Sequence, residues 1–375
     1  MNIFDTIVIG GGASGLIASS NLKGNTLLIE CNDRVGKKIL ATGNGRCNLS
    51  NQNLSGEFYS NPHFFDTIFS ANRTIVSDYF TKLGLLVKPD KAGRLYPYTM
   101  QASTVLDILR YSLNCSVRLS ERVQDIVLDK GLYTVTTDKG SYQAKFVILC
   151  TGGGKAHTRL VKSTTFSPSL CPIKTDTTRI KGLDGIKVQC GLNLLKDGKI
   201  IYSECGEVLF RNYGVSGVAV FNASSFIARD RVKGDFSKYQ ISLNFLQDTD
   251  VVVVRDIIAR RIKSKVDREK LLLGIVPNKV GLCLLSNITN FGVESIVETL
   301  SDYRLEVKDL QGDIAQVTAG GVRLDDIDDH FESREYKGLF VVGEALDMDG
   351  LCGGYNLHWA FMSGLVASKV INSKL

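Results

Sequence analysis

Three glycines near the start of the chain have the spacing that a nucleotide-binding turn requires. Gly10, Gly12 and Gly15 form a G-x-G-x-x-G pattern directly after the apolar segment Asp5–Gly10 (DTIVIG). In such a turn the first glycine permits the sharp change of direction after a strand, and the second lets a pyrophosphate approach the backbone. The third lets the following helix pack closely on the strand. Since free N–H groups at the start of that helix face the phosphates, the pattern predicts a dinucleotide site.

An acidic residue and later glycine-rich segments indicate which dinucleotide is bound. Glu30 ends a second apolar segment (TLLIE), twenty positions after Gly10, where its carboxylate can accept hydrogen bonds from a ribose. Thr151–Gly153 supplies small residues after another apolar segment. Gly338–Glu344 (GLFVVGE) and Gly350–Trp359 (GLCGGYNLHW) predict a strand ending in a carboxylate and a glycine turn that opens the last helix. Amides at that helix start can stabilise an anionic reduced flavin, so these segments favour FAD over NAD.

Few other residues are candidates for the chemistry itself. Arg94 and Tyr96 (GRLYPYT) are pocket candidates, because the arginine can hold an anion and the tyrosine can donate a proton. The alternative is a turn with an exposed arginine and a packed tyrosine, and the sequence leaves both open. Cys47 has no partner cysteine at the short spacing of the disulfide reductases, which favours a packing or flavin-contact role. For His358, beside Trp359, a structural role is favoured, and no metal site is expected.

The apolar pattern along the chain predicts the elements that position these residues. The first segments form a β-α-β unit, and Lys145–Cys150 (KFVILC) predicts a further buried strand. From about 165 to 315, short alternating segments predict a β-rich domain, within which Val251–Leu300 has helical apolar spacing. The predicted division is 1–164 for the first part of the nucleotide-binding domain, 165–249 for the inserted β-rich domain, 250–300 for a helical lobe, 301–315 for the return of the inserted domain, and 316–375 for the second part of the nucleotide-binding domain.

Composition and charge narrow the class of protein. Hydrophobic residues make up 44% and charged residues 22% of the 375 residues, as in globular proteins. The net charge of +6 is spread along the chain and forms no basic block, so no nucleic-acid partner is expected. No apolar segment is long enough to span a bilayer, and the first residues do not resemble a signal peptide. We expect a cytoplasmic protein with a small-molecule substrate; the sequence leaves its oligomeric state open.

The combination of motifs resembles a known family. The segments GGGASG, GKKILATGNGRCNLSN, GEVLFRNYGVSGVAV, TAGGV and GLFVVGEALDMDGLCGGYNLHWAFMSG are similar to those of the BaiN-like NAD(P)/FAD-dependent oxidoreductases. Relatives of that family include aminoacetone oxidases and a bile-acid 3-dehydro-4,6-reductase. The resemblance extends from about residue 5 to 370. It implies an α/β fold with a Rossmann-like, glutathione-reductase-like FAD-binding domain, an inserted β-barrel-like domain and a small helical lobe.

The same resemblance implies which residues contact FAD. They are Gly10, Gly12, Ala13, Ser14 and Gly15 at the pyrophosphate, Glu30 at the ribose, Lys38, Thr42, Gly43, Gly45, Arg46, Cys47 and Asn48 along the cofactor, Val123 at the adenine through its backbone, and Thr151, Gly152, Gly343, Glu344, Gly354, Tyr355, Asn356 and Leu357 in the rest of the cradle. One segment departs from the family pattern, because GGGKAHTRLVKSTTFSPSLCPIK is shorter than its counterpart and lacks S-Y-P-x-x-G-S-T-G-D-G-Y. In the family, that segment borders the flavin. Its shortening therefore bears on which substrate binds and on whether the usual activity is retained.

The resemblance further implies hydride transfer between flavin N5 and a small organic molecule. Only one dinucleotide fingerprint is present. NAD(P)H would therefore bind transiently at the flavin face, or the substrate would reduce the flavin and oxygen would reoxidise it. The favoured hypothesis is an NAD(P)H-fed reductase of a C=C bond in an enone. The alternatives are an oxygen-dependent amine oxidase of the aminoacetone type and an FAD-binding redox sensor without turnover.

Overall fold

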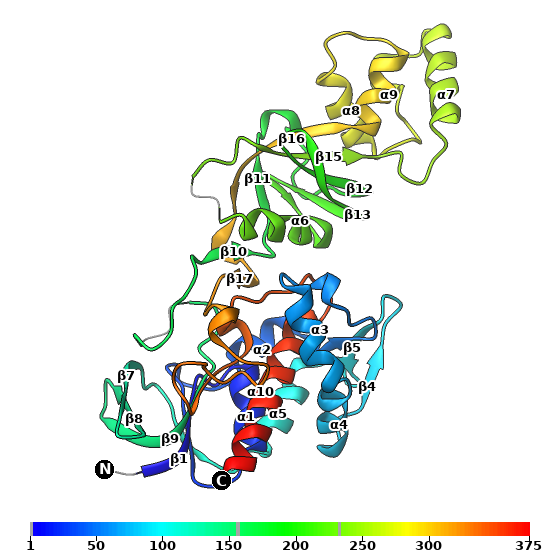
Figure 1. Ribbon diagram of the computed structural model, residues 1–375. Coiled ribbons are helices and arrows are strands. Elements are labelled where there is room, and N and C mark those ends of the chain that lie inside the picture. Colours follow the sequence, from blue (N-terminus) through cyan, green and yellow to red (C-terminus); the bar gives the residue numbers. More distant parts are fainter. Residues whose placement is uncertain (1–2, 155–157, 232–233) are drawn as a thin grey trace. The chain divides into compact units, whose positions relative to one another are not determined.

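The computed structural model describes residues 3–154, 158–231 and 234–375, and the chain divides into two compact units (Figure 1). Unit 1 comprises Met1–Phe166 and Thr318–Leu375, and unit 2 comprises Ser167–Val317. Unit 1 is therefore built from both ends of the chain, and unit 2 is one insertion between them. The corresponding boundaries expected from the sequence are after residues 164 and 315.

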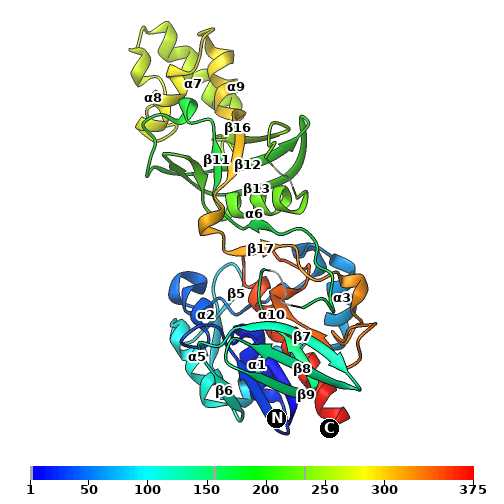
Figure 2. The same cartoon turned by 90° about the vertical axis from the view of Figure 1, so that its left-hand side faces the viewer.

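A seven-stranded sheet forms the centre of unit 1. Its strands are β1 (Ile3–Ile9), β2 (Thr26–Ile29), β6 (Ser116–Arg118), β7 (Val123–Asp129), β8 (Leu132–Thr137), β9 (Ser141–Leu149) and β18 (Leu339–Val341). Their order is β6-β2-β1-β9-β8-β7, with β18 also paired to β9. The pairs around β1 are parallel, whereas β7, β8 and β9 form an antiparallel meander (Figure 2). Together with the flanking helices, this sheet confirms the predicted Rossmann-like α/β class.

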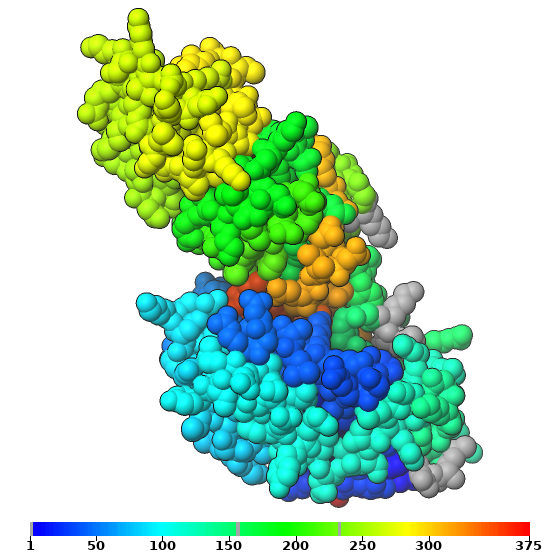
Figure 3. All heavy atoms as spheres, turned by 180° about the vertical axis from the view of Figure 1, so that it is seen from behind, coloured from blue at the N-terminus to red at the C-terminus, as the bar shows by residue number. Residues whose placement is uncertain are grey.

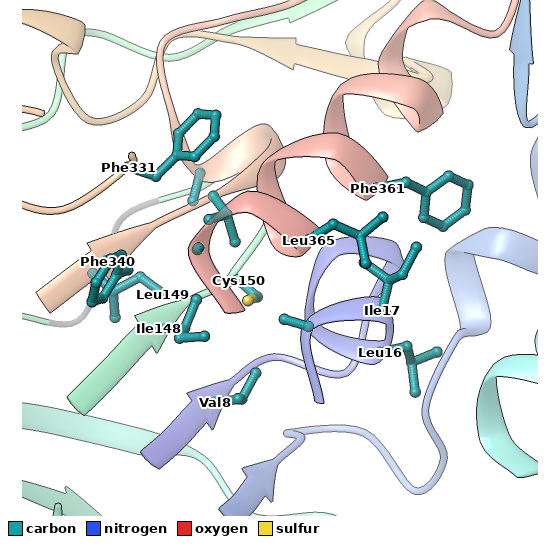
Figure 4. Close-up of a cluster of buried hydrophobic side chains, with 14 of the residues drawn as sticks. Val8, Leu16, Ile17, Ile148, Leu149, Cys150, Phe331, Phe340, Phe361 and Leu365 are labelled. Carbon is teal, nitrogen blue, oxygen red and sulfur yellow. The ribbon is translucent and has the colours of Figure 1, made fainter. Parts of the chain in front are cut away.

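Two helices, one from each end of the chain, pack against each other beside this sheet. α1 (Ala13–Asn21) follows β1, and α10 (Tyr355–Lys374) ends the chain. They approach so closely that a Cβ added at Gly364 would lie 2.6 Å from the backbone oxygen of Ser14. Ile17 of α1 and Leu365 of α10 are buried in the same apolar core (Figure 4). Both chain ends are therefore needed to complete the hydrophobic core of unit 1.

The long connection between β2 and β6 forms the remaining side of unit 1. It contains α2 (Lys37–Ala41), the 3-10 turn η1 (Thr42–Gly45), α3 (Pro62–Ala71), α4 (Ile75–Lys82), α5 (Ala102–Tyr111) and a small sheet of β3 (Ser50–Asn51), β5 (Arg94–Pro97) and β4 (Val87–Pro89). The segment 36–51 thus includes a one-turn helix and a two-residue strand. Gly36, Gly43 and Gly45 have positive φ angles, which prevents a continuous helix there.

Unit 2 contains a closed barrel and a helical lobe. The barrel order is β11-β14-β13-β12-β15-β16, with bounds β11 (Ile173–Thr175), β14 (Gly214–Ser216), β13 (Lys199–Arg211), β12 (Lys187–Lys196), β15 (Tyr239–Asn244) and β16 (Tyr303–Leu310). α6 (Val218–Arg229) contacts the barrel, and α7 (Val251–Lys263), α8 (Asn278–Ser286) and α9 (Val293–Ser301) lie between β15 and β16 in the sequence. The short strand β10 (Ser167–Ser169) begins unit 2 in the sequence, and β17 (Val317–Ala319) spans its end. The closed barrel confirms the predicted β-barrel-like insertion. Among the described residues, no helix has both the length and the hydropathy needed to cross a bilayer.

Candidate cofactor site and active site

The glycine-rich turn after β1 is shaped for the close approach of a ligand. Gly10 has a φ of +106°, and a Cβ added there would lie 2.3 Å from the carbonyl oxygen of Cys150. A Cβ added at Gly15 would lie 1.8 Å from the Gly10 oxygen, so only glycine lets α1 pack on the turn. Gly12 differs, because apart from its own chain neighbours no heavy atom of the described residues lies within 4 Å of its added Cβ. The space beside Gly12 is therefore open, as a pyrophosphate contact requires.

Helix α1 begins at this open space without a side-chain cap. Gly12 is its N-cap residue, and within the described chain no side chain caps the helix and no acidic residue occupies its first turn. The Leu16 amide donates to the Gly12 oxygen (2.9 Å). The amides of Ala13, Ser14 and Gly15 precede that bond and have no acceptor within the helix. Uncapped amides at the positive end of a helix dipole suit a phosphate.

The carboxylate of Glu30 is held at the edge of the same turn. Its Oε2 accepts a hydrogen bond from the Gly11 amide (2.7 Å), and its Oε1 accepts one from the Asn32 amide (2.8 Å). Val123 begins β7 close by, since the amide of Glu121 donates to the Glu30 carbonyl oxygen (3.1 Å). The structure thus joins Glu30, at the carboxyl end of β2 where Rossmann folds hold an adenosine, to Glu121, two residues before Val123.

The carboxyl end of β9 contributes a buried polar atom without a partner. The hydroxyl of Thr151 is buried and has no hydrogen-bond partner among the described residues. The Thr151 amide nitrogen would lie 3.3 Å from a Cβ at Gly10, so this residue borders the glycine turn. Gly152 follows with a φ of +72°. Because a buried unpaired hydroxyl is costly, the Thr151 hydroxyl and the open space at Gly12 together fit a cofactor bound along the turn.

The C-terminal half of unit 1 closes the other side of the turn through Gly343 and Glu344. A Cβ added at Gly343 would lie 2.7 Å from the Ser14 hydroxyl oxygen. The Glu344 carboxylate accepts hydrogen bonds from Lys38 Nζ (2.8 and 3.1 Å) and from the Thr318 amide (2.9 Å). The Lys38 side chain is 62% exposed and that of Glu344 is 21% exposed. This ion pair joins segments that are far apart in the sequence and leaves the lysine at the surface.

The turn before α10 is fastened to the segment that follows η1. Gly354, with a φ of +97°, approaches β3 so closely that an added Cβ would lie 2.3 Å from the Ser50 oxygen. With its amide oriented to satisfy both neighbours, Asn48 accepts a hydrogen bond from the Gly354 amide (3.0 Å) and donates one to the Ser50 oxygen (2.9 Å). Asn51 Nδ2 donates to the Gly353 oxygen (2.9 Å). The N-terminal half of the chain therefore sets the position of this turn.

The first residues of α10 combine structural side chains with free amides. The Asn356 side chain accepts from the Gly350 amide (2.9 Å) and donates to the Gly350 oxygen (2.7 Å), so it holds the turn. The Tyr355 ring stacks on Phe58 at 4.5 Å, and burial raises the pKa of Tyr355 to about 12. Among the described residues no side chain caps α10. The amides of Tyr355, Asn356 and Leu357 are therefore the groups that this turn offers to a ligand.

The loop of residues 42–48 presents backbone and not a reactive thiol. Gly43, Gly45 and Cys47 all have positive φ angles, and the Cys47 amide donates to the Thr42 oxygen (3.0 Å). The Cys47 side chain is fully buried, and this burial raises the pKa of its thiol to about 11. Because the thiolate is the reactive form, Cys47 is unreactive near neutral pH. The structure supports a packing role for this residue.

The two pocket candidates from the sequence occupy different environments. Arg94 Nε donates to the Asp90 carboxylate (2.8 Å), so its guanidinium braces the turn between β4 and β5. Tyr96 is buried, and the Arg46 guanidinium lies over its ring at 5.3 Å. Arg46 Nε also donates to the Gly43 oxygen (3.2 Å). The structure therefore brings Tyr96 and Arg46 to the cofactor loop and leaves Arg94 in the turn.

His358 is a buried histidine in the first turns of α10. Its Nδ1 lies 2.8 Å from the Ser50 hydroxyl, and its Nε2 has no partner among the described residues. Burial lowers the pKa of His358 to about 4, so the ring is neutral near pH 7. These contacts support the structural role favoured for it. The described residues contain no group of three or more His, Cys, Asp or Glu side chains that could hold a metal ion.

Three residues that hold the site were not predicted from the sequence. The Ser50 carbonyl oxygen accepts from the Asn48 side chain, Asn51 donates to Gly353 in the turn before α10, and the Thr318 amide donates to Glu344, so each of these hydrogen bonds involves a backbone group. A residue that bonds through its backbone can carry almost any side chain. The type of that residue therefore does not indicate that the hydrogen bond exists. The available signal was position, because Thr318 opens the TAGGV motif and Ser50 and Asn51 close the motif that contains GNGRCN.

Comparisons with known proteins agree with this geometry. The family model described as HI0933-like protein Rossmann domain matches residues 4–370. The 3-dehydro-bile acid delta(4,6)-reductase of Clostridium scindens is 31% identical, over 96% of this chain and 97% of that protein. The ribosomal RNA dihydrouridine synthase of Escherichia coli is 26% identical over 98% of each chain. The 3-ketosteroid delta1-dehydrogenase of Sterolibacterium denitrificans is similar in fold alone, with a TM-score of 0.50 over 100% of both chains and 12% identity.

Proposed function

Since the chain belongs to the HI0933-like family and is an FAD-dependent oxidoreductase, we propose that it reduces a C=C bond conjugated to a carbonyl group, with NAD(P)H as the electron donor. The observation that carries this proposal is the shared chemistry of two relatives that match over nearly their whole length. One is named as a delta(4,6)-reductase of 3-dehydro-bile acids, and the other is named for making dihydrouridine. Dihydrouridine is uridine with a saturated C5–C6 bond, and in uridine that bond is conjugated to the C4 carbonyl.

The residues of unit 1 supply binding and orientation for the cofactor. When bound, FAD supplies hydride chemistry at its ring. The uncapped amides of Ala13 and Ser14 would hold the diphosphate beside Gly12, and Glu30 would hold the adenosine ribose. Thr151 borders the glycine turn and Glu344 borders Gly152, and their oxygen atoms are suited to accept hydrogen bonds from the ribityl hydroxyls of a bound FAD.

The N-terminus of α10 would stabilise negative charge on a bound flavin ring. Asn48 occupies the Gly354 amide, so the next three amides are those that face a ligand. Their partial positive charge, added to that of the helix dipole, would favour the anionic reduced ring of a bound flavin over the neutral oxidised one. This preference raises the tendency of the flavin to accept a hydride from a nicotinamide.

Anaerobic mixing of the holoprotein with NADH or NADPH tests the proposal. We expect the flavin absorbance to bleach within minutes with at least one nicotinamide, because the reductase needs that half-reaction. Without bleaching by either nicotinamide, the reductase proposal is wrong. The amine-oxidase alternative instead requires bleaching by a small amine such as aminoacetone and recolouring by oxygen. The redox-sensor alternative requires that no donor and acceptor pair gives turnover.

A further inference from the structure

Two side chains of α10 hold both polar atoms of the Gly343 peptide. The Gly343 amide donates to the Ser363 hydroxyl oxygen (2.9 Å), and Trp359 Nε1 donates to the Gly343 carbonyl oxygen (3.1 Å). The Ser363 hydroxyl in turn donates to the Trp359 carbonyl oxygen, one helical turn earlier (2.7 Å). Gly343, Ser363 and Trp359 therefore form a closed ring of hydrogen bonds, in which each residue both donates and accepts.

This ring of hydrogen bonds lies inside the protein. Ser363 is fully buried and Trp359 is almost fully buried. On the face drawn in Figure 3, unit 1 shows mainly blue and cyan residues, and little of the red last helix is visible. The Gly343 oxygen also accepts from the Leu346 amide (3.2 Å), which closes the 3-10 turn η7 (Gly343–Ala345). The Gly343 amide has Ser363 as its acceptor, so removal of that hydroxyl leaves a buried donor unpaired.

The held peptide borders the glycine-rich turn of the candidate cofactor site. A Cβ added at Gly343 would lie 2.7 Å from the Ser14 hydroxyl oxygen, and one added at Gly364 would lie 2.6 Å from the Ser14 carbonyl oxygen. Ser14 is thus enclosed by Gly343 and by the residue that follows Ser363. It belongs to the first turn of α1, where the uncapped amides face the open space at Gly12. A displacement of Gly343 would therefore be transmitted to these amides.

We infer that Trp359 and Ser363 are positioning residues for FAD, which act through Gly343 on the amides at the start of α1 and on the Glu344 carboxylate. Apolar side chains would fill the same space in the core. The indole N–H and the serine hydroxyl add two polar groups that converge on one peptide. That peptide lies directly before Glu344 and against Ser14, so its position determines where both groups lie relative to a bound cofactor.

The chain offers a matched control for each positioning residue. Ser368 is another fully buried serine of α10, and its hydroxyl oxygen accepts from Asn21 Nδ2 (2.9 Å) at the last residue of α1. The Tyr133 hydroxyl donates to the Lys337 carbonyl oxygen (2.7 Å) before β18 begins, whereas Gly343 follows the end of that strand. Both controls therefore make the same kind of hydrogen bond at the opposite end of the same element.

Titration of the full-length apoprotein with FAD, followed by flavin fluorescence, tests the inference. We expect Ser363→Ala to raise the Kd for FAD at least about tenfold, because the Gly343 amide loses its acceptor. Trp359→Phe should raise it about fivefold or more, since the Gly343 oxygen keeps the Leu346 amide. Ser368→Ala and Tyr133→Phe should bind FAD within about twofold of the parent, because their bonds are distant from the cofactor turn. At saturating FAD, the visible circular dichroism of the flavin should change in the first two variants only.

A measurement on the unmodified protein does not depend on how the variants fold. Trp359 is the one tryptophan of the chain, so isotope-labelled tryptophan gives a single indole N–H signal in the NMR spectrum. We expect FAD to shift this signal, because the indole bonds to the peptide that borders the cofactor turn.

The inference rests on FAD binding and not on the identity of the substrate. NAD(P)H bleaching therefore tests the reductase proposal separately, and either can fail alone. An indole signal that FAD leaves unmoved would overturn the inference. Equal loss of FAD affinity in the two test variants and their two controls would overturn it as well.

Discussion

Asn48 and Gly354 are joined by a hydrogen bond of 3.0 Å, in which the Asn48 side chain accepts from the Gly354 amide. The bond connects the loop after η1 with the N-terminus of the last helix. It also leaves the next amides of α10 as the ones that face a ligand. The two halves of unit 1 thus meet at the place where the flavin ring is proposed to bind.

Replacing Asn48 with alanine tests the role of this bond. The Gly354 amide and the Ser50 oxygen would each lose a partner, at a cost of about 1–3 kcal/mol for each buried unpaired group. We expect Asn48→Ala to raise the Kd for FAD at least about tenfold, measured by quenching of flavin fluorescence. The exposed Asn53 provides the control, and Asn53→Ala should retain FAD. Unchanged FAD affinity in Asn48→Ala would show that the turn holds its position without this bond.

Gly12 and Gly15 are expected to respond differently to the same substitution. A methyl group at Gly12 meets no described atom, whereas at Gly15 it would lie 1.8 Å from the Gly10 oxygen. Gly12→Ala should therefore leave the Tm of the apoprotein nearly unchanged and weaken FAD binding at least about tenfold, or 1.4 kcal/mol. Gly15→Ala should lower the Tm of the apoprotein itself. Thermal unfolding and FAD titration of both variants decide the matter; a destabilised Gly12→Ala apoprotein would contradict an open space beside Gly12.

The Lys38–Glu344 ion pair is expected to matter for the cofactor and not for stability. The lysine is 62% exposed, and such surface pairs contribute about 0–1 kcal/mol. Lys38→Met should therefore change the free energy of unfolding by less than about 1 kcal/mol. It should release the Glu344 carboxylate and make the flavin harder to reduce, because a positive charge near the site is lost. Urea unfolding and the midpoint potential of the bound flavin measure the two effects; a large loss of stability with an unchanged potential would contradict this role.

His358 makes the stability of the protein depend on pH. Burial lowers its pKa from 6.5 to about 4 in the folded protein. Between these values the unfolded chain binds a proton that the folded chain does not, so the free energy of unfolding falls as the pH is lowered from 6.5 towards 4. The loss amounts to roughly 3 kcal/mol. His358→Gln should flatten this part of the urea-unfolding pH profile, and His63→Gln, at an exposed position, should not. Identical profiles for His358→Gln and the parent would contradict a neutral buried imidazole.

The cofactor turn and the fold class could be predicted from the sequence because their signals are local. The spacing of Gly10, Gly12 and Gly15 encodes a backbone shape that few other residues can adopt. The bond between Asn48 and Gly354 could not be predicted from residue types, because it joins segments whose neighbourhood exists only after folding. Arg94 shows the same limit, since only the fold reveals that Asp90 engages its guanidinium.

The extent to which the last helix belongs to the core also became apparent only in the structure. Phe361, Met362 and Leu365 are all fully or almost fully buried. A deletion of residues 350–375 would therefore unfold unit 1 along with the site. Point variants such as Asn48→Ala separate cofactor binding from folding, and a truncation does not.

Anaerobic reoxidation of the reduced flavin tests the central claim most directly. The holoprotein is reduced with NAD(P)H without oxygen and is then mixed with a conjugated enone, either a small cyclic enone or a uridine-containing RNA. The account predicts that the oxidised flavin spectrum returns without oxygen and that one saturated C–C bond forms for each flavin reoxidised. A flavin that stays reduced with every enone and is reoxidised only by oxygen would contradict it.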